Sequence, residues 1–246
     1  MKILHPIELD PYANLPFAGY LCEITKQPET YWSLMHFLEA EKYRGIDDQY
    51  RRYLLTMRET EDFRLETAGV PVAGAALEQW REVREKAIHA GLFMQFAQNK
   101  ETLAQVLLSD NFECRSEAIR AARDRIAERL ASPDPLRRVL FIGAQSEGYG
   151  DTLTPVFNHI FSQRQPDEIG ALIEPGVGFT AAQYAQNNFI PFRATACVTA
   201  DIAEAISRAS HVFQIGSDED VSEHVLNAFV QAQDMGKTTH KFGRPG

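Results

Sequence analysis

The residues with the richest chemistry lie close together, between positions 32 and 43. Trp32, His36, Glu39 and Tyr43 recur at three- and four-residue spacing, which would align them along one side of a helix. An indole, an imidazole, a carboxylate and a phenol in one stripe could line a pocket for a ring and a sugar. The same residues could equally belong to a half-buried helix whose aromatic rings are core and whose polar groups are solvated. The spacing by itself leaves both interpretations open.

The element that must position this stripe is a helix over residues 30–43. Thr30 predicts its N-cap, and Gly45 stands just beyond its C-terminal end. Four apolar residues follow the i, i+3, i+4, i+7 pattern of a buried helical face, namely Tyr31, Leu34, Met35 and Leu38. We therefore expect a helix that buries this apolar face.

A motif in this helix and further motifs downstream match a family pattern. Residues 36–43 read H-F-x-x-A-x-K-Y, and residues 80–108 contain W-x-x-V, F-A-Q-N and L-x-x-V-L-L. They resemble the segments H-Y-x-x-A-x-K-F, W-x-x-V-K-x-x-V-M, K-F-x-Q-N and L-x-x-x-L-L of the NADAR family, which contains small N-glycosidase and ADP-ribose-handling domains. Asn14 stands where that family has S-N-F.

The resemblance implies a fold and a ligand site. The fold would be an α+β, NADAR-like and mainly helical domain in the first half of the chain. The ligand would be a nucleotide or an ADP-ribose-like small molecule. Trp80 would stack on a base or simply anchor the core, and Lys42 would face a phosphate, a carboxylate or water. The other residues that the resemblance places near the ligand are Asn14, Trp32 and His36.

The departures from the family concern its catalytic chemistry. The family carries a catalytic glutamate where this chain has Met35, and a thioether can neither take nor give a proton. The later D-x-x-W-G-x-G and G-x-N-x-L-G segments are missing as well. Glu39 lies one helical turn beyond Met35, about 6 Å along the axis, with His36 beside it. We therefore expect at most weak hydrolase activity, with Glu39 and His36 as catalytic candidates.

Composition excludes some classes of partner. A net charge of −9 disfavours a nucleic-acid backbone as the main ligand, because phosphates need clustered Lys and Arg. The three cysteines, Cys22, Cys114 and Cys197, are far apart and predict reduced thiols in a cytoplasmic protein. None has the spacing of a zinc motif, so we predict no metal site and no cofactor. No apolar run has signal-peptide or membrane-spanning length, and a homo-oligomer is left open.

The pattern of the chain changes at a proline pair. Residues 1–131 predict a short strand at 21–25, then helices around 46–57, 77–98, 101–109 and from Ser116 to Leu130. Residues 132–137, which contain Pro133 and Pro135, predict a linker. Residues 138–246 then alternate strands with helices, which indicates a Rossmann-like α/β domain with a parallel sheet. The expected strands are 138–143, 169–173, 211–216 and 237–242, and the expected helices are 154–161, 181–186, 200–209 and 221–235.

A glycine-containing loop follows the first of these strands. Gly143, Gly148 and Gly150 could bring main-chain amides close to a phosphate before a helix that Thr154 caps and Pro155 begins. The loop matches neither the GxGxxG nor the Walker pattern and carries acidic residues, so a plain connection is an equal alternative. Gly176 and Gly178 pose the same choice between close approach to a ligand and a simple turn.

The last βαβ unit offers a second catalytic candidate. Gly216 ends the strand at 211–216, and Glu223 lies in the first turn of the next helix. This resembles nucleotide-processing domains of the deoxyribosyltransferase type, in which a glutamate at this place acts on the sugar. The alternative is that the acidic residues 218–220 only complement the helix dipole. The second domain could therefore serve a non-catalytic nucleotide sensor or a partner-binding protein.

Overall fold

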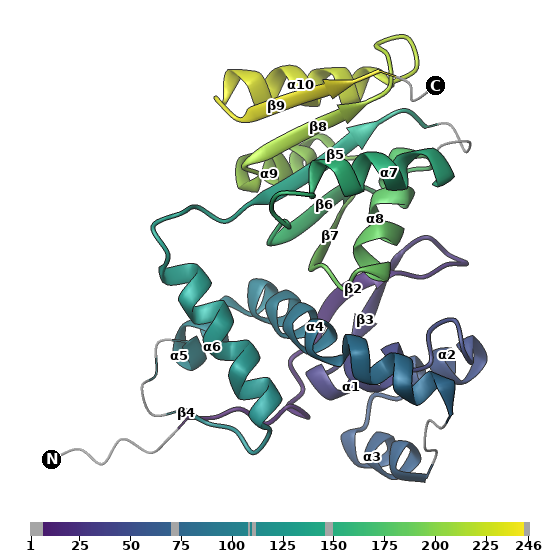
Figure 1. Cartoon of the computed structure of the whole chain (residues 1–246), viewed down its shortest axis with the longest axis vertical. Coiled ribbons are helices and arrows are strands. Elements are labelled where there is room, and N and C mark those ends of the chain that lie inside the picture. Colours follow the sequence, from purple (N-terminus) through teal and green to yellow (C-terminus); the bar gives the residue numbers. More distant parts are fainter. Residues whose placement is uncertain (1–6, 70–73, 108, 110–111, 146–149, 244–246) are drawn as a thin grey trace, which may run out of the picture. The chain divides into compact units, whose positions relative to one another are not determined.

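The computed structural model describes residues 7–69, 74–107, 109, 112–145 and 150–243 (Figure 1). The chain divides into two compact units. The N-terminal unit comprises Met1–Gly19 and Glu29–Ser132, and the C-terminal unit comprises Tyr20–Pro28 and Pro133–Gly246. The division at residue 132 lies within the expected linker, but residues 20–28 belong to the second unit instead of the first. No helix of the described residues is long and apolar enough to cross a membrane.

The N-terminal unit is mainly helical. Its described helices are α1 (Leu34–Glu41), α2 (Asp48–Thr56), α3 (Thr60–Gly69), α4 (Ala75–Gln98), α5 (Lys100–Leu107) and α6 (Glu117–Ala131). Strand β1 (Ile7–Glu8) pairs in parallel with β4 (Phe112–Glu113). Strands β2 (Phe17–Leu21) and β3 (Pro28–Tyr31) pair with each other. The segment Tyr20–Pro28, which contains the end of β2, the loop and the first residue of β3, is counted in the C-terminal unit.

The N-cap of the first helix lies three residues later than the sequence pattern predicts. Residues 28–31 form β3, so Thr30 is an exposed strand residue and not a cap. Ser33 is the N-cap instead: its backbone is extended and its hydroxyl accepts a hydrogen bond from the amide of His36 at 3.1 Å. The expected strand at 21–25 was wrong by a similar shift, because β2 ends at Leu21.

Helix α4 is the centre of the N-terminal unit and packs against α1, α5 and α6. Gly91 allows the closest of these contacts. A Cβ atom at Gly91 would lie 2.6 Å from the Phe37 ring and 3.0 Å from Leu34, so only glycine lets α1 approach α4 this closely. At the C-terminal end of α4, the side-chain amides of Gln98 and Asn99 bond to main-chain groups of residues 16 and 18.

The C-terminal unit contains a five-stranded parallel sheet in the order β7-β6-β5-β8-β9. The strands are β5 (Arg138–Gly143), β6 (Glu168–Leu172), β7 (Phe192–Thr195), β8 (His211–Ile215) and β9 (Thr238–Phe242). The helices between them are α7 (Gly150–Ile160), α8 (Val177–Asn187), α9 (Thr199–Arg208) and α10 (Glu223–Asp234). Helices α7 and α8 pack together on one face, and α9 and α10 on the other (Figure 1).

This sheet is an α/β arrangement in which the strand order reverses between β5 and β8: β6 and β7 lie on one side of β5, and β8 and β9 lie on the other. The four expected strands are present, but β7 was missed: its sequence F-R-A-T is short and carries an arginine where a buried strand would be apolar. The predicted start of α7 was also wrong, since Pro155 lies inside the helix. Helix α8 begins at Val177, well before residue 181, because Gly178 packs directly on β6.

Candidate functional site

A cavity of about 500 Å³ lies inside the N-terminal unit. Its walls come from α1, α3, α4 and the start of α6. We call it the α1 cavity; its lining residues are Pro11, Met35, Leu38, Glu39, Lys42, Tyr43, Thr67, Leu77, Trp80, Arg81, Arg84, Ile88, Ser116 and Ile119. This volume falls in the range of small-molecule sites, which span roughly 300–1,000 Å³.

Helix α1 contributes one continuous stripe to this cavity. Met35, Leu38, Glu39 and Lys42 follow the i, i+3, i+4, i+7 pattern and all face the opening. Each of the two stripes expected from the sequence therefore has only some of its residues at the cavity. The reason is that Leu34 and Phe37 pack on α4 and so fix the rotation of the helix. Met35 and Glu39, the two positions compared in the resemblance, line the same space.

The aromatic and cationic side chains of the cavity come mostly from α4. Trp80 is 7% exposed, and Arg81 and Arg84 follow it on the same helix. Arg81 also pairs with the exposed Glu78 at 2.7 Å. Lys42 pairs with Glu39 across one turn at the end of α1, and both side chains are largely buried. The lining of the cavity thus combines an indole, three cations and one carboxylate that is paired with Lys42.

Three of the sequence-predicted ligand residues lie elsewhere. His36 and Trp32 do not line the α1 cavity, and neither does Asn14, which is exposed. The guanidinium of Arg58 covers the Trp32 ring at 4.8 Å. The indole nitrogen of Trp32 is buried and has no hydrogen-bond partner among the described residues. The geometry therefore supports Glu39, Lys42 and Trp80 as one group and separates the other three from it.

His36 connects main-chain segments of the N-terminal unit. Its Nδ1 accepts a hydrogen bond from the Trp32 amide at 3.2 Å, and its Nε2 lies 2.8 Å from the Leu54 carbonyl oxygen. These partners require a neutral ring that carries its proton on Nε2. Burial lowers the pKa of His36, although the bond to the Leu54 carbonyl opposes the shift. This ring has no free nitrogen for acid–base work in the α1 cavity.

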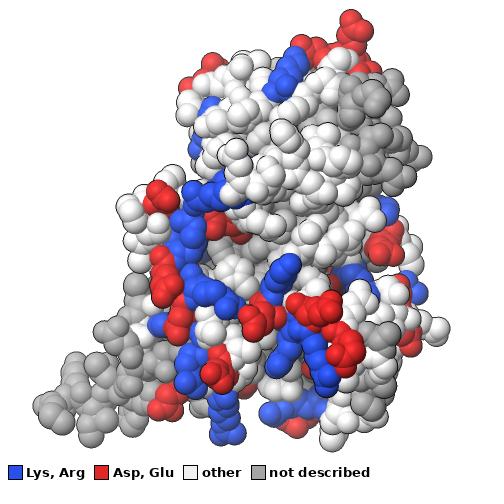
Figure 2. Space-filling view, in the orientation of Figure 1, with Lys and Arg blue, Asp and Glu red and all other residues white. Residues whose placement is uncertain are grey.

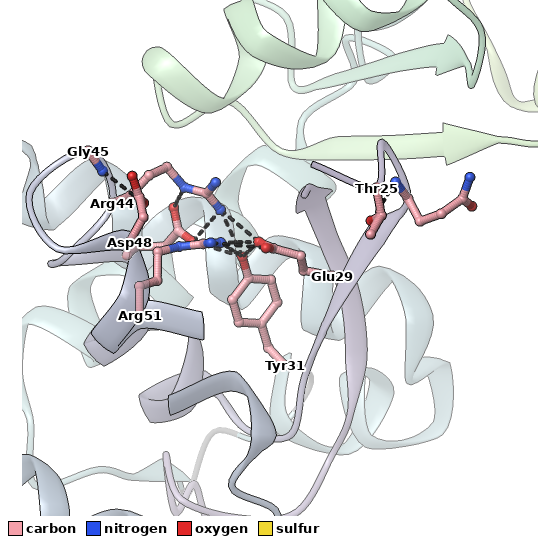
Figure 3. Close-up of polar contacts among 9 residues, drawn as sticks. Thr25, Glu29, Tyr31, Arg44, Gly45, Asp48 and Arg51 are labelled. Atoms are coloured by element: carbon pink, nitrogen blue, oxygen red, sulfur yellow. Dashed lines mark hydrogen bonds and ion pairs between the residues drawn. The ribbon is translucent and has the colours of Figure 1, made fainter. Parts of the chain in front are cut away.

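A second polar group in this unit is a buried ion cluster, formed by Glu29, Tyr31, Glu41, Arg44 and Arg51. Figure 3 shows both guanidinium groups pointing toward Glu29 and the phenol of Tyr31. Arg44 also binds both carboxylate oxygens of Glu41, at 2.6 and 2.7 Å, and the Tyr31 hydroxyl donates to Glu41 at 2.7 Å. The cluster joins β3 to α1 and α2, so it positions the helix that lines the cavity.

Charges within this cluster reinforce one another. Burial by itself would raise the pKa of Glu41, but the adjacent guanidinium of Arg44 and its hydrogen bonds hold that pKa below its ordinary value. The pKa of Tyr31 is raised well above its ordinary value by burial and by Glu41. Glu41 therefore stays ionised and Tyr31 stays protonated, which keeps the hydrogen bonds and ion pairs of the cluster intact. We assign the cluster a structural role.

The sheet of the C-terminal unit gathers polar side chains beyond the ends of its strands. Glu174 follows β6 and is 6% exposed, Cys197 follows β7, and His224 lies in the first turn of α10. The Glu174 Oε2 atom lies 3.2 Å from His224 Nε2 and 3.7 Å from Cys197 Sγ. Gln145, which follows β5, donates to the same oxygen at 2.7 Å.

The thiol of this group is not an activated nucleophile. Burial raises the pKa of Cys197 to about 11, and the neighbouring carboxylate of Glu174 adds to the rise. A thiol with such a pKa is protonated near neutral pH unless a cation is bound beside it.

No protein-family model matches this chain, and no curated protein matches it.

The predicted site residues of the second domain have mixed surroundings. Gly143 is buried where a Cβ would lie 2.3 Å from the Ile215 carbonyl oxygen, so its glycine is explained by packing. Gly148 lies outside the described residues, and Gly150 begins α7. Gly216 adopts a φ of +111°, which favours glycine, and a Cβ there would lie 2.9 Å from Ala144. Glu223 is exposed.

Sequence reasoning missed the group at Glu174, Cys197 and His224. The three residues are separated by 23 and 27 positions, so no short motif contains them. Their positions in the chain could have indicated the group, because each residue follows a strand of a parallel sheet. Ligands of such sheets bind beyond the carboxyl ends of the strands.

Proposed function

We propose that the N-terminal unit binds a nucleotide or ADP-ribose-type ligand in the α1 cavity. One observation carries this proposal: an indole, three cations and a carboxylate line one cavity in a protein whose net charge is −9. Figure 2 shows acidic and basic side chains intermingled over the helices drawn in the lower part of that view.

Each class of side chain has a part of such a ligand to hold. The flat face of Trp80 suits a base, and stacking of this kind is worth roughly 1–3 kcal/mol per base. Arg81 and Arg84 suit phosphate oxygens, because a guanidinium binds two oxygens at once. The carboxylate of Glu39, held by Lys42, can accept hydrogen bonds from ribose hydroxyls or from a water molecule.

The NADAR-type resemblance extends this proposal to chemistry. Cleavage of an N-glycosidic bond needs a group that handles a proton within hydrogen-bond reach of the sugar. Met35 cannot do so, whereas Glu39 lines the same cavity one turn further along α1. The proposed activity is accordingly binding with at most slow hydrolysis that depends on Glu39.

Calorimetric titration of the full chain with ADP-ribose, NAD and AMP tests the binding. Trp80→Phe keeps an aromatic face and should preserve binding, whereas Trp80→Leu should weaken it about 5- to 150-fold. Arg84→Gln should also weaken binding, and Arg52→Gln is its matched control, because Arg52 is exposed on α2 and does not line the cavity. Binding that survives both Trp80→Leu and Arg84→Gln would move the ligand site to another part of the chain.

Chromatographic analysis of products from the same three nucleotides tests the chemistry. Glu39→Gln should abolish whatever hydrolysis the wild type has, and Met35→Glu should increase it. Brisk hydrolysis that Glu39→Gln leaves unchanged would refute the assignment, and Glu223 would then be the next residue to substitute.

A further inference from the structure

We propose that Glu174, Cys197 and His224 form a binding site for a divalent transition-metal ion of the zinc type. The three side chains come from three different connections of the C-terminal unit, yet their ligand atoms all lie within 4.8 Å of one another. The site belongs to a different unit from the α1 cavity and is independent of the function proposed above.

The distances suit one ion held by all three side chains. Zinc binds carboxylate oxygen and imidazole nitrogen at about 2.0–2.2 Å and thiolate sulfur at about 2.3 Å. Ligands of a tetrahedral site are then about 3.3–3.7 Å apart, which follows from these bond lengths. The Glu174 oxygen lies 3.2 Å from the His224 nitrogen and 3.7 Å from the Cys197 sulfur. The His224 nitrogen and the Cys197 sulfur lie within 4.8 Å of each other, so an ion fits once these two side chains move closer together.

The donor atoms select the class of metal. One sulfur, one imidazole nitrogen and one carboxylate oxygen form a mixed set of intermediate softness, which suits Zn²⁺ and related ions. Magnesium and calcium prefer oxygen ligands and usually six or more of them. A set with a thiol and an imidazole among three ligands thus discriminates against both of these common cations.

The surroundings hold the carboxylate in place while leaving the ion accessible. Glu174 is buried, and the side-chain amide of Gln145 donates to its Oε2 atom at 2.7 Å. Hydrogen bonds to a ligating carboxylate orient it in known metal sites. The Ser222 hydroxyl lies 3.2 Å from His224 Nε2 and would give up this contact when the nitrogen binds the ion. The thiol of Cys197 is exposed, so an ion can enter from solvent.

Three protein ligands leave the fourth tetrahedral position for water or a substrate atom. Structural zinc sites are usually closed by four protein ligands, whereas catalytic sites keep one position open. Its location also fits, because ligands of open parallel sheets bind beyond the carboxyl ends of the strands. The geometry thus points to an open metal site and not to a structural clamp.

Cobalt substitution tests the site in the full chain. Chelator-treated protein titrated with Co²⁺ should bind one equivalent with thiolate-to-cobalt charge-transfer absorption and the strong visible bands of tetrahedral cobalt. Cys197→Ser should remove the charge-transfer band. His224→Ala should weaken Zn²⁺ binding at least tenfold in competition with a chromogenic chelator.

Two matched controls share the chemistry but not the site. Cys22→Ser replaces a partly buried thiol of the same unit, and Glu223→Gln replaces the exposed carboxylate next to His224. Both should bind Co²⁺ and Zn²⁺ like the wild type. Absence of one-equivalent binding, or a charge-transfer band that survives Cys197→Ser and disappears with Cys22→Ser, would overturn the proposal. Cys197 is exposed, so its serine variant is expected to fold, and circular dichroism would verify this.

Discussion

The substitution Glu41→Gln tests whether the buried ion cluster holds the N-terminal unit together. It keeps the size of the side chain but removes its charge and replaces one acceptor oxygen by a donor. Glu41 binds the Arg44 Nε at 2.6 Å and an Arg44 terminal nitrogen at 2.7 Å, and it accepts from Tyr31 at 2.7 Å. In the variant, one Arg44 nitrogen faces the amide nitrogen of the glutamine, which cannot accept a hydrogen bond.

The expected cost follows from these contacts. Hydrogen bonds to charged groups contribute roughly 1.5–3 kcal/mol each, and the variant weakens both of those from Arg44. Breaking a buried ion pair by removal of one partner typically costs about 3–5 kcal/mol. Both routes predict that the free energy of unfolding falls by about 3–5 kcal/mol.

Tryptophan fluorescence isolates this unit in the assay. The chain has two tryptophans, Trp32 and Trp80, and both belong to the N-terminal unit. Urea unfolding followed by this signal therefore reports on the unit that contains the cluster. Glu61→Gln is the matched control: it breaks an ion pair with Arg64 that is exposed at the surface and should leave the midpoint unchanged.

The pH dependence provides a second readout. The pKa of Glu41 is lowered in the folded protein, so its contribution is complete above the unfolded value near 4.3 and is lost as the pH falls through the folded value. The difference in the free energy of unfolding between wild type and Glu41→Gln should therefore be constant near neutral pH and decrease in acid. A loss below about 1 kcal/mol at pH 7 would refute the reasoning, because such a value is typical of a solvated pair.

Three further predictions concern particular side chains. Burial lowers the pKa of His36, so the stability of the N-terminal unit should decline as the pH falls below about 6.5, and His36→Gln should remove that decline in fluorescence-monitored unfolding. Gly178→Ala should reduce hydrogen-exchange protection of β6, because its Cβ would collide with a main-chain oxygen of Leu172, at a cost of roughly 1–3 kcal/mol or more. Gly69→Ala is the control: its Cβ would meet open space, and the exchange protection of β6 should not change. Tyr20→Phe should destabilise the C-terminal unit by about 1 kcal/mol in the same exchange experiment, since its buried hydroxyl donates to the Ile190 carbonyl at 3.1 Å.

Local pattern was enough for most of the individual elements. The cap at Ser116 and the apolar repeat of α6 predicted that helix correctly, because both signals act within a few residues. The apolar runs of β5, β6 and β8 likewise predicted strands, since a strand covered on both faces needs continuous apolar side chains. The proline pair marked the part of the chain where the two units divide.

Tertiary contacts decided the rest. Thr30 and Tyr31 were predicted to begin the first helix, but strand pairing with β2 and the bonds of Tyr31 in the ion cluster make them part of a strand. The rotation of α1 is set by Phe37 against Gly91, which lies more than fifty residues away. That rotation is what brings Glu39 and Lys42, but not His36, to the cavity.

The two candidate sites show the same division between local and long-range information. The sequence by itself predicted one helix that carries Glu39, and it predicted a parallel sheet after residue 138. Only the fold could join Glu174, Cys197 and His224, because each follows a different strand and their distance depends on strand order. Periodicity records which side of an element a residue occupies, whereas the partner it meets there is fixed by packing over long sequence distances.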